Sequence, residues 1–392
     1  MKSIPVESVR PLLYPDGILY LDEDYVLCSP DVPVSENLVK RLKAWNYKTI
    51  LIDESVKPQT KTLAQNLSEG DVTHVFLDDD NRDTKDKKKT QEIYVTFLEN
   101  LQQSLDNFNK KGALYVDEIA NQAKEIYSAL KDYHRFLLQL TILDRNGFPY
   151  LTCHSVNTAI LGMAIGENLK IPPHRIIEIG MAGLLHEIGM LHQSFAKIQT
   201  ADRKLTPEEL KTLKAHPVLS YKILKEKGFP ANTCLGALGH HEKEDGSGYP
   251  QGLNKENIPS SAKIIAVASA YDAMVSSRPF RPAIDGYSAI LEIIKEIGKT
   301  YHDQVVRHLI AVIGFVPLGT LVELKNGSYA LVHSINTKDV KKPFLKVLTS
   351  TDKKPISEHP LVQLGQSPEW ELLKAYSREE YHKLKAQGLI EN

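Results

Sequence analysis

The segment from His240 to Pro250 reads HHEKEDGSGYP, in which two adjacent histidines are followed by an acid and a Gly-Ser-Gly turn. Adjacent side chains cannot share one face of a helix or strand, so this pattern is typical of a helix that ends in a metal site. Imidazole suits transition metals, and the acid can bind the metal or orient another ligand. The segment therefore indicates metal-dependent chemistry, provided that further ligands lie upstream.

Further histidines precede this segment at positions that fit such a site. Seven of the 14 histidines lie between residues 154 and 241, among them His154, His186 and His216, and Glu187 follows the second of these three. Each lies in an apolar helical pattern, where an unpaired polar group would be costly. Any one of them alone is most simply a core or surface histidine. The five histidines together, with His240 and His241, favour one shared site.

Helical sites that combine histidines with a His-acid pair hold metals for hydrolysis. A metal ion polarises a phosphoryl oxygen and lowers the pKa of a bound water, and two metal ions can clamp an in-line displacement. Mixed imidazole and carboxylate ligands favour Fe, Mn or Zn over Ca or Mg. The residue types therefore suggest phosphoester hydrolysis.

Composition narrows the class of protein. A chain of 392 residues is long enough for two or three domains, and 42% hydrophobic with 25% charged residues is typical of a soluble globular protein. The net charge of −1 gives no basic footprint for DNA or RNA. Three distant cysteines indicate a reduced compartment. With no signal-peptide pattern and no apolar run of about 18 residues, we expect no membrane association and a cytoplasmic location.

The first 90 residues alternate short β-rich and helical pieces, which predicts a small α+β regulatory domain. The stretch 78–89, DDDNRDTKDKKK, is almost entirely charged and is interpreted as a solvated loop or linker. The expected elements are strands at 17–20, 25–28, 48–53 and 72–77, and a helix from Ser35 to about Trp45.

The rest of the chain is mainly helical in pattern. Apolar residues recur at helical spacing in 90–111 and 116–143, which predicts connecting helices that pair within the chain or across a homodimer. Helix then follows helix from 149 to 316. Alternating residues around Asn326-Gly327 predict a β-hairpin, with a third strand at 344–348 and a helical tail over the last 25 residues. The fold class is mainly α, with predicted domains at 1–90, 91–145, 146–316 and 317–392.

The ordered motifs resemble one family, the HD-GYP proteins, a branch of the HD metallohydrolases. The match runs in order from His154 to Arg281, and HHEKEDGSGYP reproduces the family's longest signature. Other matching segments are His154–Asn157, Gly183–Gly189, Leu205–Glu209, Lys214–Pro217, Ile258–Pro259, Ala262–Ile264 and Arg278–Arg281. Members are typically cyclic di-GMP phosphodiesterases, so the resemblance implies an all-helical HD-GYP domain that hydrolyses cyclic di-GMP to pGpG and GMP.

The resemblance also implies site residues, cofactors and partners. The metals would be two divalent transition ions, Fe or Mn, with Zn as a further candidate. The partners would be cyclic di-GMP and a GGDEF-type diguanylate cyclase that binds the GYP loop. The implied metal ligands are His154, His186, Glu187, His216, His240 and His241; the catalytic pair is His186 and Glu187; the substrate-binding residues are Gly248, Tyr249, Arg278 and Arg281, the arginines as forks for phosphate.

Several positions depart from the family pattern. Glu187 replaces the aspartate of the His-Asp pair and keeps its carboxylate. Met190 replaces a lysine that helps with phosphate charge. Ser269 replaces an aspartate ligand, so that only Asp272, one turn further on, remains. Tyr150 replaces the glutamate of members with three metals, so at most two metals are expected. His192, in a longer loop, is either an extra ligand or a surface residue.

Two main functions follow from this comparison, and hydrolysis of a different nucleotide or phosphoester is a further alternative. The first is a metal-dependent cyclic di-GMP phosphodiesterase of reduced activity, favoured by the five histidines and the intact GYP loop. The second is a degenerate HD-GYP module that binds metal or cyclic dinucleotide as a receptor or interaction protein. Ser269 and Met190 favour the second, because the loss of a ligand or its support weakens metal binding.

Overall fold

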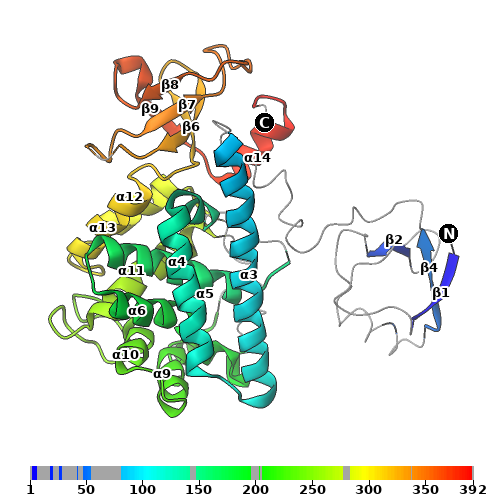
Figure 1. Ribbon diagram of the computed structural model, residues 1–392, viewed down its shortest axis with the longest axis vertical. Coiled ribbons are helices and arrows are strands. Elements are labelled where there is room, and N and C mark those ends of the chain that lie inside the picture. Colours follow the sequence, from blue (N-terminus) through cyan, green and yellow to red (C-terminus); the bar gives the residue numbers. More distant parts are fainter. Residues whose placement is uncertain are drawn as a thin grey trace. The chain divides into compact units, whose positions relative to one another are not determined.

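The computed structural model of the protein describes residues 2–6, 18–20, 26–28, 42, 47–53, 81–141, 147–195, 203, 205–276, 283–336 and 338–390 (Figure 1). The chain divides into two compact units. One comprises residues 1–69 with 145–147, and the other comprises 70–144 with 148–392. The domain boundaries expected from the sequence stay predictions.

The first unit contains a four-stranded sheet in the order β1-β4-β2-β3. In β4, Ile50 and Ile52 alternate with more exposed residues, as a strand with one buried face requires. Three of the strands expected from the sequence are confirmed, whereas β1 was not predicted. The predicted helix from Ser35 and the predicted strand at 72–77 lie outside the described residues. The strands are β1 (Lys2–Pro5), β2 (Ile18–Tyr20), β3 (Val26–Cys28) and β4 (Thr49–Asp53).

The second unit begins with two long helices, α3 (Asn81–Lys111) and α4 (Val116–Leu140), which lie side by side (Figure 1). The prediction of a loop or linker at 78–89 was wrong from Asn81 onward, because α3 includes these charged residues. Lysine is a good helix former, and Lys85, Lys88 and Lys89 are exposed while Lys87 is buried, so this stretch forms one face-packed turn of the helix and not a linker.

Helix α5 (Tyr150–Asn168) is the centre of the helical domain, because nearly all of its residues from Thr152 to Gly166 are buried. It packs against α4, α6, α11 and α13. The other helices are α6 (Pro173–Leu185), η3 (Ile188–Leu191), η4 (Gln193–Phe195), α8 (Pro207–Leu213), α9 (His216–Glu226), α10 (Ala231–Gly239), α11 (Ser260–Val275), α12 (Gly286–Lys295) and α13 (Asp303–Ile313).

The chain continues into a five-stranded antiparallel sheet in the order β8-β7-β6-β5-β9. The predicted hairpin and third strand are confirmed as β5, β6 and β7. The predicted helical tail was wrong in part. Among the described residues of the tail, only α14 is helical apart from a short 3₁₀ turn, because Leu372 packs on the sheet core and its strand pairs with β5. The elements are β5 (Leu321–Leu324), β6 (Tyr329–Ser334), β7 (Phe344–Val347), β8 (Leu361–Gln363), η5 (Pro368–Trp370), β9 (Leu372–Ala375) and α14 (Arg378–Ala386).

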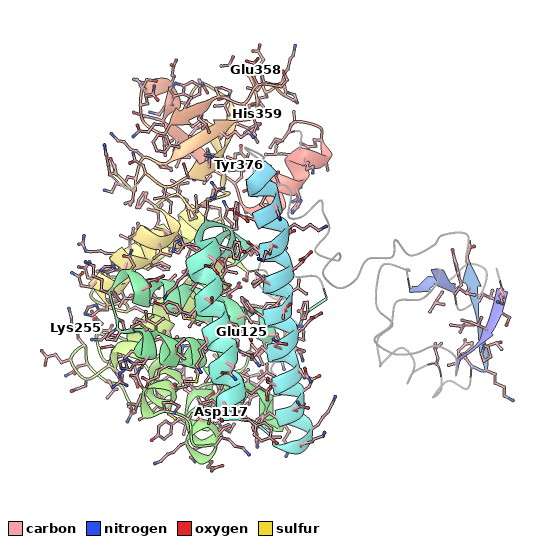
Figure 2. All side chains as sticks on the ribbon, in the orientation of Figure 1. Asp117, Glu125, Lys255, Glu358, His359 and Tyr376 are labelled. Carbon is pink, nitrogen blue, oxygen red and sulfur yellow. The ribbon has the colours of Figure 1, made fainter. Side chains whose placement is uncertain are left out.

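Side chains at the end of the sheet hold β9 in place. Tyr376, labelled in Figure 2, follows β9, and its hydroxyl donates a hydrogen bond to Glu323 on β5. Lys353 donates to the other oxygen of Glu323 at 2.7 Å.

The predicted mainly α fold is confirmed. Among the helices that the structure describes, none combines the length and apolarity needed to cross a membrane.

Candidate metal centre

Three of the predicted ligands stand at helix ends, and each is oriented by a backbone carbonyl. His186 follows α6, His240 follows α10, and His216 opens α9. In each imidazole, Nδ1–H donates to the carbonyl oxygen three residues earlier, so that Nε2 is left as an acceptor directed at the centre. The Nδ1–O distances are 2.8 Å to Gly183, 2.7 Å to Leu213 and 2.7 Å to Ala237.

His154 is oriented by a carboxylate instead. It lies in the first half of α5 and is buried, and its Nδ1 is 2.7 Å from Oδ2 of Asp272 on α11. The carboxylate can only accept, so Nδ1 carries the hydrogen and Nε2 is again the acceptor. The four imidazoles therefore present the same atom to one interior space.

The distances between these acceptors fit a metal ion. Nε2 of His154 and Nε2 of His186 are 3.3 Å apart, and Nε2 of His216 and Nε2 of His240 are 3.2 Å apart. Two lone pairs that face each other in a buried site repel unless a cation lies between them. Two nitrogens bound at about 2.1 Å to one tetrahedral ion lie about 3.4 Å apart. The donor atoms are thus spaced as two pairs of metal ligands.

Glu187 belongs to both groups of ligands. One group is His154, His186 and Glu187; the other is Glu187, His216, His240 and His241; within each, the ligand atoms lie within 4.8 Å of one another. Its Oε2 is 3.4 Å from Nε2 of His216. Because a carboxylate has two oxygens, one side chain can serve two ions.

Burial keeps the imidazoles ready to bind a metal. The pKa values of His186, His240 and His241 lie well below the ordinary value, first because burial penalises the charged form and then because neighbouring histidines repel a second charge. Metal ligation requires neutral imidazole. These three side chains are therefore in the binding form at neutral pH.

The loop after His241 is tied down by Glu242. Its carboxylate accepts hydrogen bonds from the backbone N–H of Gln251 at 2.7 Å and of Leu253 at 2.8 Å. A Cβ at Gly248 would lie 2.3 Å from the backbone nitrogen of Lys243, so only glycine fits there. The substrate-binding role of Gly248 stays a prediction. The anchoring role of Glu242 was not predicted. From the sequence, this acid was expected to bind the metal or to orient another ligand.

Tyr249 covers one side of the centre. Its ring stacks on that of His241, with ring centres 4.6 Å apart, and Nζ of Lys214 lies 5.5 Å from the centre of the tyrosine ring. Burial and the charge of Glu187 raise the pKa of the phenol, so that it stays protonated. Lys214 thus brings a cation beside the centre, a role that was not predicted from the sequence.

The residues that depart from the family pattern lie at the same centre or beside it. The hydroxyl of Ser269 donates to Nε2 of His154 at 3.2 Å, so a neutral group stands where an aspartate ligand was expected. The ring of Tyr150 stacks on that of His154, with ring centres 5.3 Å apart. His192 is exposed, bonds Ser194 and belongs to neither ligand group. Met190 lies in η3.

Two predicted substrate-binding residues, Arg278 and Arg281, lie outside the described residues.

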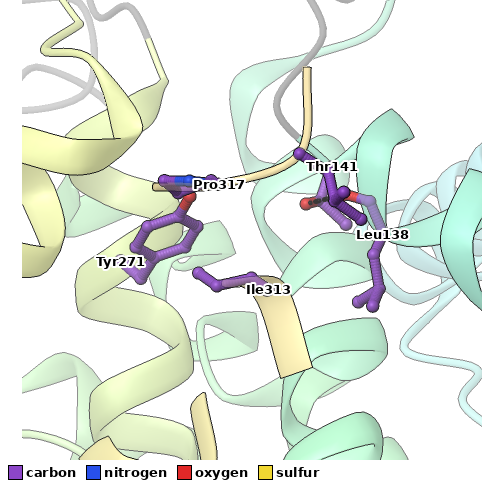
Figure 3. A pocket seen from close by; sticks show the side chains of 6 residues that line it. Leu138, Thr141, Tyr271, Ile313 and Pro317 are labelled. Atoms are coloured by element: carbon purple, nitrogen blue, oxygen red, sulfur yellow. Dashed lines mark hydrogen bonds between the residues drawn. The ribbon is translucent and has the colours of Figure 1, made fainter. Parts of the chain in front are cut away.

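A small cavity among the described residues is lined by Leu138, Thr141, Tyr271, Ile313, Pro317 and Leu318. Figure 3 shows the hydroxyl of Tyr271 beside Pro317 and the hydrogen bond from Thr141 to the Leu138 carbonyl. None of the histidines lines this cavity, so it is separate from the candidate metal centre.

Comparison with known proteins agrees with this geometry. Residues 137–306 match the model of the HD domain. The chain is 26% identical to a cyclic di-GMP phosphodiesterase of Borreliella burgdorferi over 85% of this chain and 84% of that protein. It is 31% identical to a cyclic di-GMP phosphodiesterase of Pseudomonas aeruginosa over 62% of this chain and 58% of the relative. A solved structure, Bd1817, a "HDG"Y"P protein" of Bdellovibrio bacteriovorus, is similar at 20% identity with a TM-score of 0.49, covering 79% of this chain and 97% of that chain.

Residues 137–306, which include all five of the clustered histidines, thus match the HD domain. The resemblance to HD-GYP proteins that the motifs indicated is confirmed.

Proposed function

We propose that this protein is a metal-dependent phosphodiesterase that hydrolyses cyclic di-GMP to pGpG and GMP. The observation that carries the proposal is the membership of Glu187 in both ligand groups, which gives the HD domain the donors for two adjacent ions. The names of the relatives in Borreliella and Pseudomonas support the substrate. The catalytic residues would be His186 and Glu187.

The cofactors would be two divalent transition ions, Fe or Mn, with Zn as a further candidate. One ion would be held by His154, His186 and Glu187. The other would be held by Glu187 with His216, His240 and His241. When bound, such ions polarise a phosphoryl oxygen and activate water for attack.

The protein's own side chains would position the substrate and exclude water. Tyr249, stacked on His241, would border the substrate, and Lys214 beside it would supply a positive charge for phosphate. The phenol of Tyr249 stays protonated and can donate a hydrogen bond. Arg278 and Arg281 would complete phosphate binding. A GGDEF-type partner at the GYP loop and a homodimer through the long helices are further proposals.

The second candidate function is a receptor or interaction module without turnover. Ser269 favours it, because a neutral hydroxyl 3.2 Å from Nε2 of His154 replaces a charged ligand in the group that has the fewest donors. The two functions differ in product formation and share metal binding.

One experiment separates them. The full chain is loaded with Mn²⁺ or Fe²⁺ and incubated with cyclic di-GMP, and pGpG is followed by chromatography. The variant His240→Ala removes a buried ligand, and His308→Ala, on α13, is the matched control. Product formation that is lost only in His240→Ala supports the enzyme. Tight binding of cyclic di-GMP without product would contradict the enzyme and support the receptor. Faster turnover of 3′3′-cGAMP than of cyclic di-GMP would show that the substrate is a different cyclic dinucleotide.

A further inference from the structure

A line of buried hydrogen bonds connects α3 to the candidate metal centre. The hydroxyl of Tyr94 on α3 donates to Oδ1 of Asn157 on α5 at 2.8 Å. Nδ2 of Asn157 donates to Oδ1 of Asp272 on α11 at 2.5 Å. The other oxygen of Asp272 accepts the hydrogen bond from Nδ1 of His154 at 2.7 Å. The four side chains are at most 2% exposed, so the line runs through the interior.

The amide of Asn157 can adopt only one orientation in this line. Its second N–H donates to the backbone carbonyl of Thr141 at 2.7 Å. A carbonyl and a carboxylate are acceptors, so both require the nitrogen end of the amide. A flipped amide would direct Oδ1 at two acceptors. The hydroxyl of Tyr94 donates to Oδ1 and so stabilises the orientation that presents N–H to Asp272.

His154 differs from the other ligands in what supports it. His186, His216 and His240 rest on backbone carbonyls, which the helices themselves fix in place. His154 rests on a side-chain carboxylate, which must itself be held by other side chains. Carboxylates that orient a metal-binding histidine typically change metal affinity when they are removed.

Ser269 makes this support more important. It places a hydroxyl next to His154 and adds no negative charge. In the group of His154, His186 and Glu187, negative charge therefore comes from Glu187 and, through the imidazole, from Asp272. A misplaced Asp272 would leave this group with a single oriented carboxylate.

We propose that Tyr94 and Asn157 are positioning residues of the metal centre. They hold Asp272 in the rotamer that orients His154, and they thereby set the metal affinity of the group formed by His154, His186 and Glu187. This makes α3 a part of the support of the centre, although it contributes no ligand among the described residues. The inference rests on the proposed metal binding and does not depend on which nucleotide is hydrolysed.

The test is a calorimetric Mn²⁺ titration of the metal-free full chain. Two groups of ligands should give two binding steps. The step that persists in His241→Ala belongs to the group of His154, because His241 is in the other group. We expect Tyr94→Phe to weaken that step by about three- to tenfold and to leave the other step unchanged. Asp272→Asn should weaken the same binding step by more, about 10- to 100-fold. The matched control is Tyr127→Phe, which removes a hydroxyl that bonds Glu167 away from this line.

Thermal unfolding separates positioning from a general structural role. A structural role would lower the stability and weaken both steps together, which would overturn the inference. Binding by Tyr94→Phe within twofold of the wild type would also overturn it. If Tyr94→Phe does not fold, Asn157→Ser interrupts the same line at the next residue and carries the same expectation. A wild type that binds no Mn²⁺ would contradict the metal centre itself, whereas normal binding that is insensitive to Tyr94 would contradict only this inference.

Discussion

Oε2 of Glu187 lies 3.4 Å from Nε2 of His216, although its neighbour in the chain, His186, belongs to the other ligand group. The helix α6 ends at Leu185 and the 3₁₀ helix η3 begins at Ile188. The two residues between these helices therefore point in different directions: His186 reaches His154, whereas Glu187 reaches both of them and also His216, His240 and His241. This break in the helix is what allows one carboxylate to join both groups.

Removal of the charge of Glu187 should affect both groups at once. We expect Glu187→Gln to lower the metal content and to reduce turnover at least about 100-fold, because an amide is a poor ligand for transition ions. Glu187→Asp keeps the charge and should retain metal binding within about tenfold. Metal content by mass spectrometry and turnover by chromatography measure these effects. Equal metal content in Glu187→Gln and the wild type would show that this carboxylate is not a shared ligand.

Addition of a carboxylate at Ser269 should strengthen the group with fewer donors. The hydroxyl of Ser269 is 3.2 Å from Nε2 of His154, so an aspartate there would reach the same space. We expect Ser269→Asp to raise the Mn²⁺ affinity of that group about tenfold or more and to increase turnover. Ser269→Asn, of the same size but neutral, is the matched control. An affinity that rises equally in both variants, or in neither, would contradict the assignment of Ser269 to the ligand shell.

Acidification should destabilise the metal-free protein. The pKa values of His186, His240 and His241 are lowered in the folded state, whereas the ordinary value is about 6.5. Below pH 6.5 the unfolded chain binds protons that the folded chain does not, so the free energy of unfolding falls as the pH falls. Each histidine contributes a slope of up to about 1.4 kcal/mol per pH unit until its own lowered pKa is reached.

Urea unfolding of chelator-treated protein between pH 8 and pH 5.5 measures this slope. His192→Gln, at an exposed histidine, should leave it unchanged. Mn²⁺ affinity should fall over the same range, because protons compete for Nε2. A free energy of unfolding that stays constant or rises on acidification would contradict neutral, buried histidines.

Glu242 should hold the signature loop against His240 and His241. Its two oxygens accept two backbone N–H groups, and glutamine can accept only one of them. We expect Glu242→Gln to lower the free energy of unfolding by about 1–3 kcal/mol, because a backbone N–H loses its hydrogen bond to a charged carboxylate. Glu256→Gln, at an exposed position, is the control for charge alone. Equal stabilities in urea for Glu242→Gln and Glu256→Gln would show that the two hydrogen bonds contribute nothing.

The sequence was most informative where a local pattern fixes a local structure. Histidines at 186, 216 and 240 were predicted as one cluster because each lies in an apolar helical pattern, and the structure brings them together. The hairpin at Asn326-Gly327 was predictable because that turn determines its own geometry. By contrast, β9 forms because it pairs with β5, a contact that local propensity does not contain.

Long-range side-chain contacts were the part that the sequence could not supply. Nothing local connects Tyr94 with Asn157, or Asn157 with Asp272, since each pair is separated by many residues and joined only by packing of α3, α5 and α11. The charged start of α3 was misread for a related reason, because exposed lysines are compatible with both a loop and a helix. Arg278 and Arg281 stay predictions.

The most direct measurement is the number of transition-metal ions that the full chain retains after anaerobic purification, counted by inductively coupled plasma mass spectrometry. Two groups of donors joined by Glu187 predict close to two ions per chain in the wild type. Glu187→Gln should retain fewer. A wild-type chain that retains no Fe, Mn or Zn, and that takes up none on loading, would contradict the metal centre and the hydrolysis proposed to depend on it.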